Sequence, residues 1–77
     1  MSALVAATAP RPQTRAQLIA ALIVHYETEA SRLRDRAALE NSSRLAERMV
    51  DTAEGFELRA RSLRRTLRAV VRSEGCT

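Results

Sequence analysis

Arginine is concentrated near the C-terminal end of this 77-residue chain. Six arginines and no acidic residue occur between positions 59 and 72. Guanidinium groups make paired hydrogen bonds to carboxylates and phosphates, so these side chains could bind an anionic partner. On a helical wheel five of them share one face, which we call the predicted basic stripe: Arg61, Arg64, Arg65, Arg68 and Arg72.

Residues suited to catalysis or metal binding are few. His25 and Tyr26 are the only neutral acid–base side chains of the usual kind, and a lone histidine without a nucleophile or a second ligand is weak evidence for a reaction. We interpret Ser42 and Ser43 as helix caps. The acidic cluster is interpreted as a solvated face that lacks converging metal ligands: Glu47, Asp51, Glu54 and Glu57. We therefore expect no catalytic residue, no metal, no cofactor and no enzyme.

Helices must position the basic stripe, because the composition leaves little for a sheet. The chain has one Phe, one Tyr and no Trp, and neither Gly nor Pro occurs between Pro12 and Gly55. Thr14 and Gln17 fit a capping box at the start of a helix. The short polar run at 41–43 is the only turn signal before Gly55. The fold class that we predict is all-α.

Two heptad patterns flank that turn signal. The first consists of Ala16, Ile19, Ile23, Tyr26, Ala30, Leu33 and Ala37. The second consists of Ala46, Met49, Ala53, Phe56, Ala60, Leu63, Leu67 and Val70. Their registers do not join, so the chain must fold back, and together they predict one heptad seam in an antiparallel helical hairpin. In this arrangement Tyr26 faces Phe56, and Ile23 faces Ala60.

The predicted organisation is a hairpin over 14–73 between two tails. It comprises a helix over 14–40, a turn at 41–43 and a helix over 43–73, with a flexible tail at 1–13 and a frayed end at 74–77. Gly55 is the main objection, because glycine inside a helix costs about 1 kcal/mol relative to alanine. If the helix ends there, the alternative is a three-helix bundle. We prefer the continuous helix because the heptad passes Gly55 in phase.

Several large apolar residues fall outside the seam and form a predicted oligomer or partner interface: Leu18, Leu22, Val24, Leu45 and Leu58. The run 18–24 is apolar on all sides, which is typical of a helix that is covered by something else. A chain of this length has a thin core. We therefore expect a homodimer that forms a four-helix bundle, while a different protein could cover the same residues.

The single cysteine and the short apolar segments limit the classes of protein to which the chain can belong. Cys76 is the only cysteine, so an internal disulfide is excluded. The N-terminal segment lacks a basic region of a secretory signal, and the longest later apolar run is shorter than the roughly 20 residues that span a bilayer. We expect a cytoplasmic interaction protein that binds a protein surface as adaptor, inhibitor or assembly subunit, with no membrane. The alternative is a nucleic-acid-binding protein that uses the stripe from Arg59 to Arg72.

Overall fold

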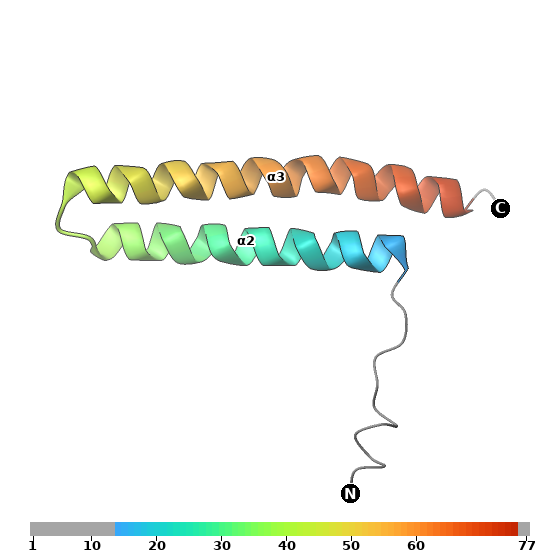
Figure 1. The fold of residues 1–77 in the computed structure, drawn as a ribbon, viewed down its shortest axis with the longest axis horizontal. Helices are drawn as coiled ribbons and strands as arrows, with labels where there is room; N and C mark the ends of the chain where they lie inside the picture. The colour runs from blue at the N-terminus through green and yellow to red at the C-terminus, as the bar shows by residue number, and fades with distance from the viewer. Residues whose placement is uncertain (1–13, 76–77) are drawn as a thin grey trace, which may run out of the picture.

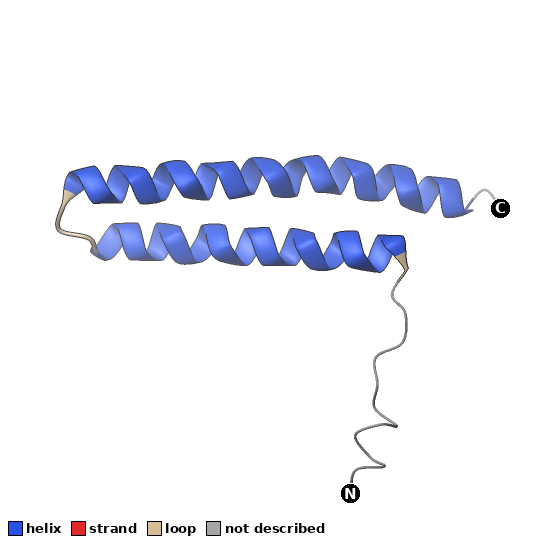
Figure 2. Ribbon diagram, in the orientation of Figure 1, coloured by secondary structure: helices blue, strands red, loops and turns tan. Residues whose placement is uncertain are grey.

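The computed structural model describes residues 14–75, which form two helices and the turn between them. Helix α2 covers Arg15–Leu39 and helix α3 covers Ser43–Gly75. The two helices lie side by side and run in opposite directions (Figure 1), and no strand occurs in the part of the chain that is described (Figure 2). The predicted all-α helical hairpin is confirmed.

Helix α2 begins at the predicted capping box. The backbone N–H of Gln17 donates to the Thr14 hydroxyl at 3.1 Å, and the backbone N–H of Thr14 donates to the Gln17 side-chain oxygen at 2.9 Å. Two backbone donors that the first turn would leave free are thereby satisfied. The predicted tail at 1–13 lies outside the described residues.

The turn uses the short polar side chains at its centre. Helix α2 ends at Leu39, and the N–H of Glu40 donates to the Ala37 carbonyl at 3.2 Å. The N–H of Ser42 then donates to the Glu40 carboxylate at 3.2 Å, and the Ser42 hydroxyl accepts from the N–H of Leu45 at 3.4 Å. Ser42 therefore caps α3, whereas Ser43, which the sequence also suggested as a cap, is the first helical residue.

The heptad seam forms the contact between the helices. Every seam residue is buried or half-buried, and Ile19, Ile23 and Ala60 form a cluster that Leu63, Leu67 and Val70 cover. The rings of Tyr26 and Phe56 stack with their centres 5.7 Å apart, as the predicted register requires. Four of the six buried residues are alanines: Ala30, Ala37, Ala53 and Ala60. Alanine lets two helices approach closely but removes little apolar area from water, so the core is thin.

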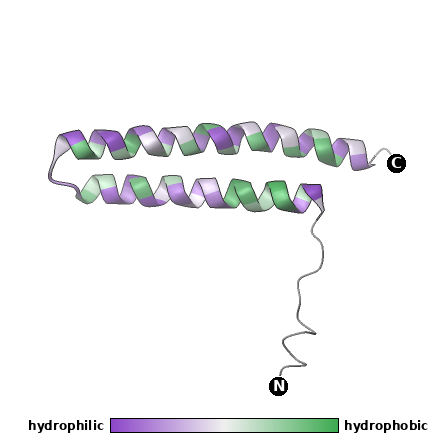
Figure 3. Ribbon diagram, in the orientation of Figure 1, coloured by the Kyte–Doolittle hydropathy of each residue, from purple (hydrophilic) through white to green (hydrophobic). Residues whose placement is uncertain are grey.

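Hydropathy is distributed unevenly along the two helices. Figure 3 shows an apolar band near the start of α2, where the run 18–24 lies, and many hydrophilic residues along α3. Within that band only Ile19 and Ile23 are buried. The other large apolar side chains of the band remain in contact with solvent, which agrees with the expectation that one hairpin alone does not cover them.

Helix α3 is continuous through Gly55, so the three-helix alternative is wrong. The helix has 33 residues and ends at Gly75, two residues beyond the end expected from the sequence. A Cβ atom added at Gly55 would meet nothing within 4 Å, and no glycine of the described residues has a positive φ. Neither a turn nor a close contact within the hairpin requires glycine at this position.

We therefore predict that Gly55→Ala stabilises the hairpin by up to about 1 kcal/mol, because alanine has the higher helix propensity and restricts the unfolded chain. The midpoint of urea unfolding, followed by circular dichroism, measures the effect. Gly75→Ala, at the last helical residue, should shift the midpoint much less. A Gly55→Ala protein that unfolds at lower urea than the wild type would contradict this interpretation.

Candidate interaction surface

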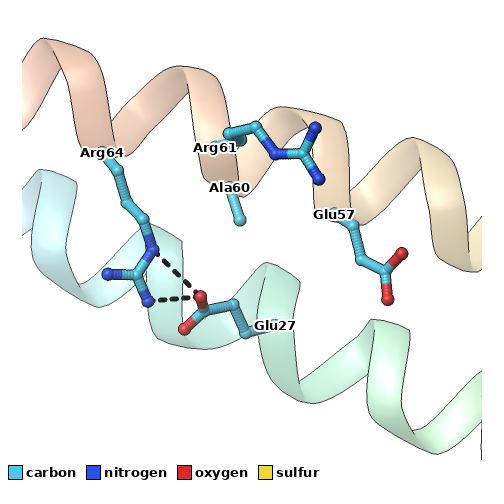
Figure 4. Close-up of a pocket in the computed structure, with 5 residues that line it drawn as sticks. All are labelled: Glu27, Glu57, Ala60, Arg61 and Arg64. Carbon is cyan, nitrogen blue, oxygen red and sulfur yellow. Dashed lines mark hydrogen bonds and ion pairs between the residues drawn. The ribbon is translucent and has the colours of Figure 1, made fainter.

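One edge of the seam is closed by ion pairs between the helices. The guanidinium of Arg34 on α2 donates two hydrogen bonds of 2.8 Å to the two carboxylate oxygens of Glu57 on α3. Seven residues away on each helix, Arg64 of α3 donates to Glu27 of α2, with Nε at 3.1 Å from the oxygen (Figure 4). A spacing of seven on both helices places the two pairs at equivalent heptad positions, on the same edge.

The ion pair with Arg34 perturbs the titration of Glu57. The hydrogen bond from Arg34 is the largest effect and lowers the pKa of the Glu57 carboxyl. Desolvation opposes it, and the positive charges of Arg34 and Arg61 lower the pKa further. The same hydrogen bond raises the pKa of Arg34. The two side chains are 44% and 37% exposed, and ion pairs that remain in contact with water contribute little to stability. Their main effect is to fix how the helices are aligned.

A lowered pKa in the folded state predicts an acid response. Because Glu57 releases its proton more readily when folded, its stabilising contribution is complete above the unfolded pKa of about 4.3 and is lost as the pH falls through the folded pKa. Glu57→Gln should therefore reduce the loss of stability between neutral pH and about pH 3. Urea midpoints at the two pH values measure this. Glu47→Gln, at a glutamate without an ion pair in residues 14–75, should keep the wild-type response; equal responses for both variants would refute the assignment.

The predicted basic stripe separates into arginines with different surroundings. Arg64 forms an ion pair with Glu27, and Arg61 lies close enough to Glu57 to lower the pKa of its carboxyl. Arg59, which precedes the stripe, lies with its guanidinium carbon 5.8 Å from the centre of the Tyr26 ring, within range of a cation–π contact. The contacts of Arg64 and Arg59 join α3 to α2, whereas Arg61 and Glu57 both belong to α3.

Three arginines of the stripe remain open to a partner. Arg65, Arg68 and Arg72 are exposed and make no ion pair with any residue that the structure describes. Together with Ala69 they line a shallow hollow of about 210 Å³ on the outside of α3. Their spacing of three and four residues places all three guanidinium groups over the same stretch of helix. The hollow is small and wide open, which suits contact with a protruding acidic group.

A second hollow, of about 370 Å³, lies at the edge with the ion pairs (Figure 4) and is lined by Glu27, Glu57, Ala60, Arg61 and Arg64. Three of its four charged groups are already engaged: Arg64 pairs with Glu27, and Glu57 pairs with Arg34. A ligand would have to displace these contacts. We therefore regard this hollow as a consequence of helix alignment.

The five apolar residues of the predicted interface do not share one face. All are exposed, but the heptad places Leu18, Leu22 and Leu45 on the edge opposite the ion pairs. Val24 lies on the side of the ion pairs, and Leu58 lies on the outer face of α3. Sequence reasoning overlooked Leu39, which is 83% exposed beside the turn. Its position outside the heptad seam was the available signal.

The other residues that the sequence suggested as possible catalytic or metal-binding groups include His25, Tyr26 and the acidic cluster. Tyr26 is half-buried in the seam between Phe56 and His25, whose ring centre lies 5.5 Å from that of Tyr26. Glu54 acts through space on Arg34, whose pKa it helps to raise. Among residues 14–75 no three His, Cys, Asp or Glu side chains are grouped as a metal site needs. Within the same range, neither helix is long and apolar enough to cross a membrane.

Comparisons of the chain with protein-family models, with curated proteins and with solved structures found no match. The chemistry of the surface is therefore the guide to function.

Proposed function

We propose that this chain is a small non-enzymatic interaction protein of the cytoplasm that binds an acidic protein surface through the outside of α3, as an adaptor, inhibitor or assembly subunit. The observation that carries the proposal is the group Arg65, Arg68 and Arg72, which we call the basic face. These side chains are exposed and without an ion pair in the described residues, whereas Arg64 is engaged with α2.

The basic face lowers the stability of α3 in the isolated chain. Like charges three or four residues apart on a helix destabilise it by about 0.2–0.5 kcal/mol per pair, and this arrangement occurs between Arg65 and Arg68 and again between Arg68 and Arg72. A face that only needs solvation normally mixes glutamate with arginine. A partner that supplies carboxylates would offset this repulsion and gain paired hydrogen bonds.

The test is affinity capture from the native host with three baits. The wild type should recover a partner in stoichiometric amount. A variant with Arg65→Glu, Arg68→Glu and Arg72→Glu should lose this partner. The matched control carries Arg15→Glu, Arg36→Glu and Arg48→Glu, which changes the net charge equally at exposed positions away from the basic face, and should keep it. Equal recovery by both variants would count against the proposal.

Nucleic acid is a second candidate, since guanidinium groups also suit phosphates. The observation in its favour is the alignment, around the 210 Å³ hollow, of three arginines that make no ion pair within residues 14–75. Against it, the chain has no Trp, and its only Tyr and Phe, Tyr26 and Phe56, both lie in the seam and not on the basic face, where they could stack on bases.

A labelled duplex distinguishes the two candidates. If phosphate is the ligand, the duplex binds at low salt, the affinity falls steeply as salt rises, and reversal of the basic face abolishes binding. The protein proposal expects no such binding.

A further inference from the structure

The outer face of α3 carries charges in a particular order. From the start of the helix these residues follow one another at intervals of three and four: Glu47, Asp51, Glu54, Leu58, Arg61, Arg65 and Arg68. All of them are exposed. The three residues before Leu58 are acidic, and the three after it are basic. Leu58 therefore marks a reversal of charge on a single helical face.

Helix α2 makes no ion pair with this face among residues 14–75, although the charge of Arg34 acts through space on Glu54. Its residues Arg34 and Glu27 form their ion pairs with Glu57 and Arg64, which belong to the edge of the seam. Glu47, Asp51, Arg65 and Arg68 make no ion pair with any described residue. Within each half, moreover, residues of like charge are neighbours along the helix, which is unfavourable for an isolated chain.

We propose that a second copy of this chain pairs with α3 through this outer face, in antiparallel orientation. The proposal rests on the proposed function and names the acidic protein surface that Arg65 and Arg68 of the basic face bind, together with Arg61. A two-fold axis at Leu58 places this leucine against Leu58 of the partner subunit. Glu54 then faces Arg61 of the partner subunit, Asp51 faces the partner's Arg65, and Glu47 faces the partner's Arg68.

The register follows from the spacing of the charges. Each acidic residue lies nearly as far before Leu58 as its basic counterpart lies after it, so one antiparallel alignment satisfies all three pairs. The two-fold axis repeats every pair. A parallel alignment would place like charges opposite each other. At either end of the contact Arg44 faces Arg72 of the partner subunit, which is the one repulsive contact in this alignment.

The ion pairs and the leucine contact determine how strongly the two copies associate. Exposed ion pairs are individually weak and are screened by salt. Leu58 supplies the apolar centre, since its side chain is 59% exposed in the single hairpin. We therefore expect a dimer that forms at low salt and dissociates as the salt concentration increases. The seam and the ion pairs with α2 remain as they are in the single chain.

Charge exchange with analytical ultracentrifugation tests this arrangement. One variant carries Glu47→Arg, Asp51→Arg and Glu54→Arg; the other carries Arg61→Glu, Arg65→Glu and Arg68→Glu. The wild type should dimerise at ~20 mM NaCl and dissociate at ~500 mM. Each variant alone should bind itself at least about tenfold more weakly than the wild type binds itself, because all six pairs become repulsive. An equimolar mixture of the two should restore the dimer, since every pair is again complementary.

Arg44→Glu tests whether the dimer can be strengthened, which a folding defect cannot do. It converts the repulsive contact with Arg72 of the partner subunit into an attractive one and should tighten the dimer by about fivefold at low salt. Circular dichroism verifies that each variant remains helical.

The alternatives give distinct results. If the wild type is monomeric throughout but the captured partner still depends on the basic face, the second copy is wrong and the proposed function stands. If the wild type dimerises and both charge variants dimerise equally well on their own, the outer face is not the interface. Dissociation by Leu22→Asp would then assign the dimer to the apolar edge. Loss of both the dimer and the captured partner would overturn the inference together with the proposed function.

Discussion

Replacing Ile23 by alanine is expected to destabilise the chain by about 2–5 kcal/mol, because deletion of a buried branched side chain leaves a cavity that the surrounding residues fill only in part. Ile23 is 5% exposed and belongs to the cluster with Ile19 and Ala60. In a domain of this size a single core supplies no more than about 3–5 kcal/mol. The Ile23→Ala protein should thus lose about half or more of its stability and unfold at a much lower urea concentration than the wild type.

The adjacent residue offers a matched control. Val24 is 61% exposed, so Val24→Ala should change the free energy of unfolding by no more than about 0.5 kcal/mol. Helical circular dichroism as a function of urea measures both proteins. If Ile23→Ala unfolded at the same urea concentration as Val24→Ala, the apolar cluster would not be the main source of stability.

The second large effect is expected from enlarging a buried alanine. Ala53 is completely buried in the contact between the helices, where Ala30 and Ala37 are also buried. Ala53→Leu adds volume to a site that has none to spare, and such overpacking costs about 1–3 kcal/mol. The leucine would force the two helices apart near the turn.

Ala38→Leu is the control for overpacking, because Ala38 is exposed on α2 and its side chain has room to grow. The urea midpoint of Ala53→Leu should fall well below that of Ala38→Leu. If the two midpoints coincided, the close approach of the helices at their alanines would be wrong.

The sequence was sufficient to predict the hairpin. The spacing of Ala30, Ala53 and the other seam residues determines which side of each helix is buried, and the mismatch of register at 41–43 requires a turn there. The stacking of Tyr26 on Phe56 also follows from that register. Gly55 was the uncertain position. Its weak helix propensity is outweighed by the packing of Ala53 and Ala60, which lie on either side of it in the seam.

The division of the arginines was not predicted. The sequence placed Arg64 in one stripe with Arg65 and Arg68, because all three fall within the same half-turn of the wheel. Which of them reaches the other helix depends on where Glu27 lies across the seam. The sequence does place opposite charges at equivalent heptad positions of the two helices. Predicting the ion pairs from them requires aligning the antiparallel helices residue by residue.

The directions of the exposed apolar side chains were also not predicted. The heptad spacing indicates that five apolar residues lie outside the seam, and all five are exposed: Leu18, Leu22, Val24, Leu45 and Leu58. It does not show that they point in three directions. Only the positions of the ion pairs distinguish one edge of the hairpin from the other.

The central claim is that the basic face serves a partner and not the fold. The most direct measurement is the thermal midpoint of Arg65→Glu at a concentration where the wild type is monomeric. The introduced carboxylate lies four residues from Arg61 and three from Arg68, so two repulsive pairs become attractive. We expect a higher midpoint, equivalent to about 1 kcal/mol. A midpoint below that of the wild type would contradict it, because Arg65 would then be needed to hold the hairpin together.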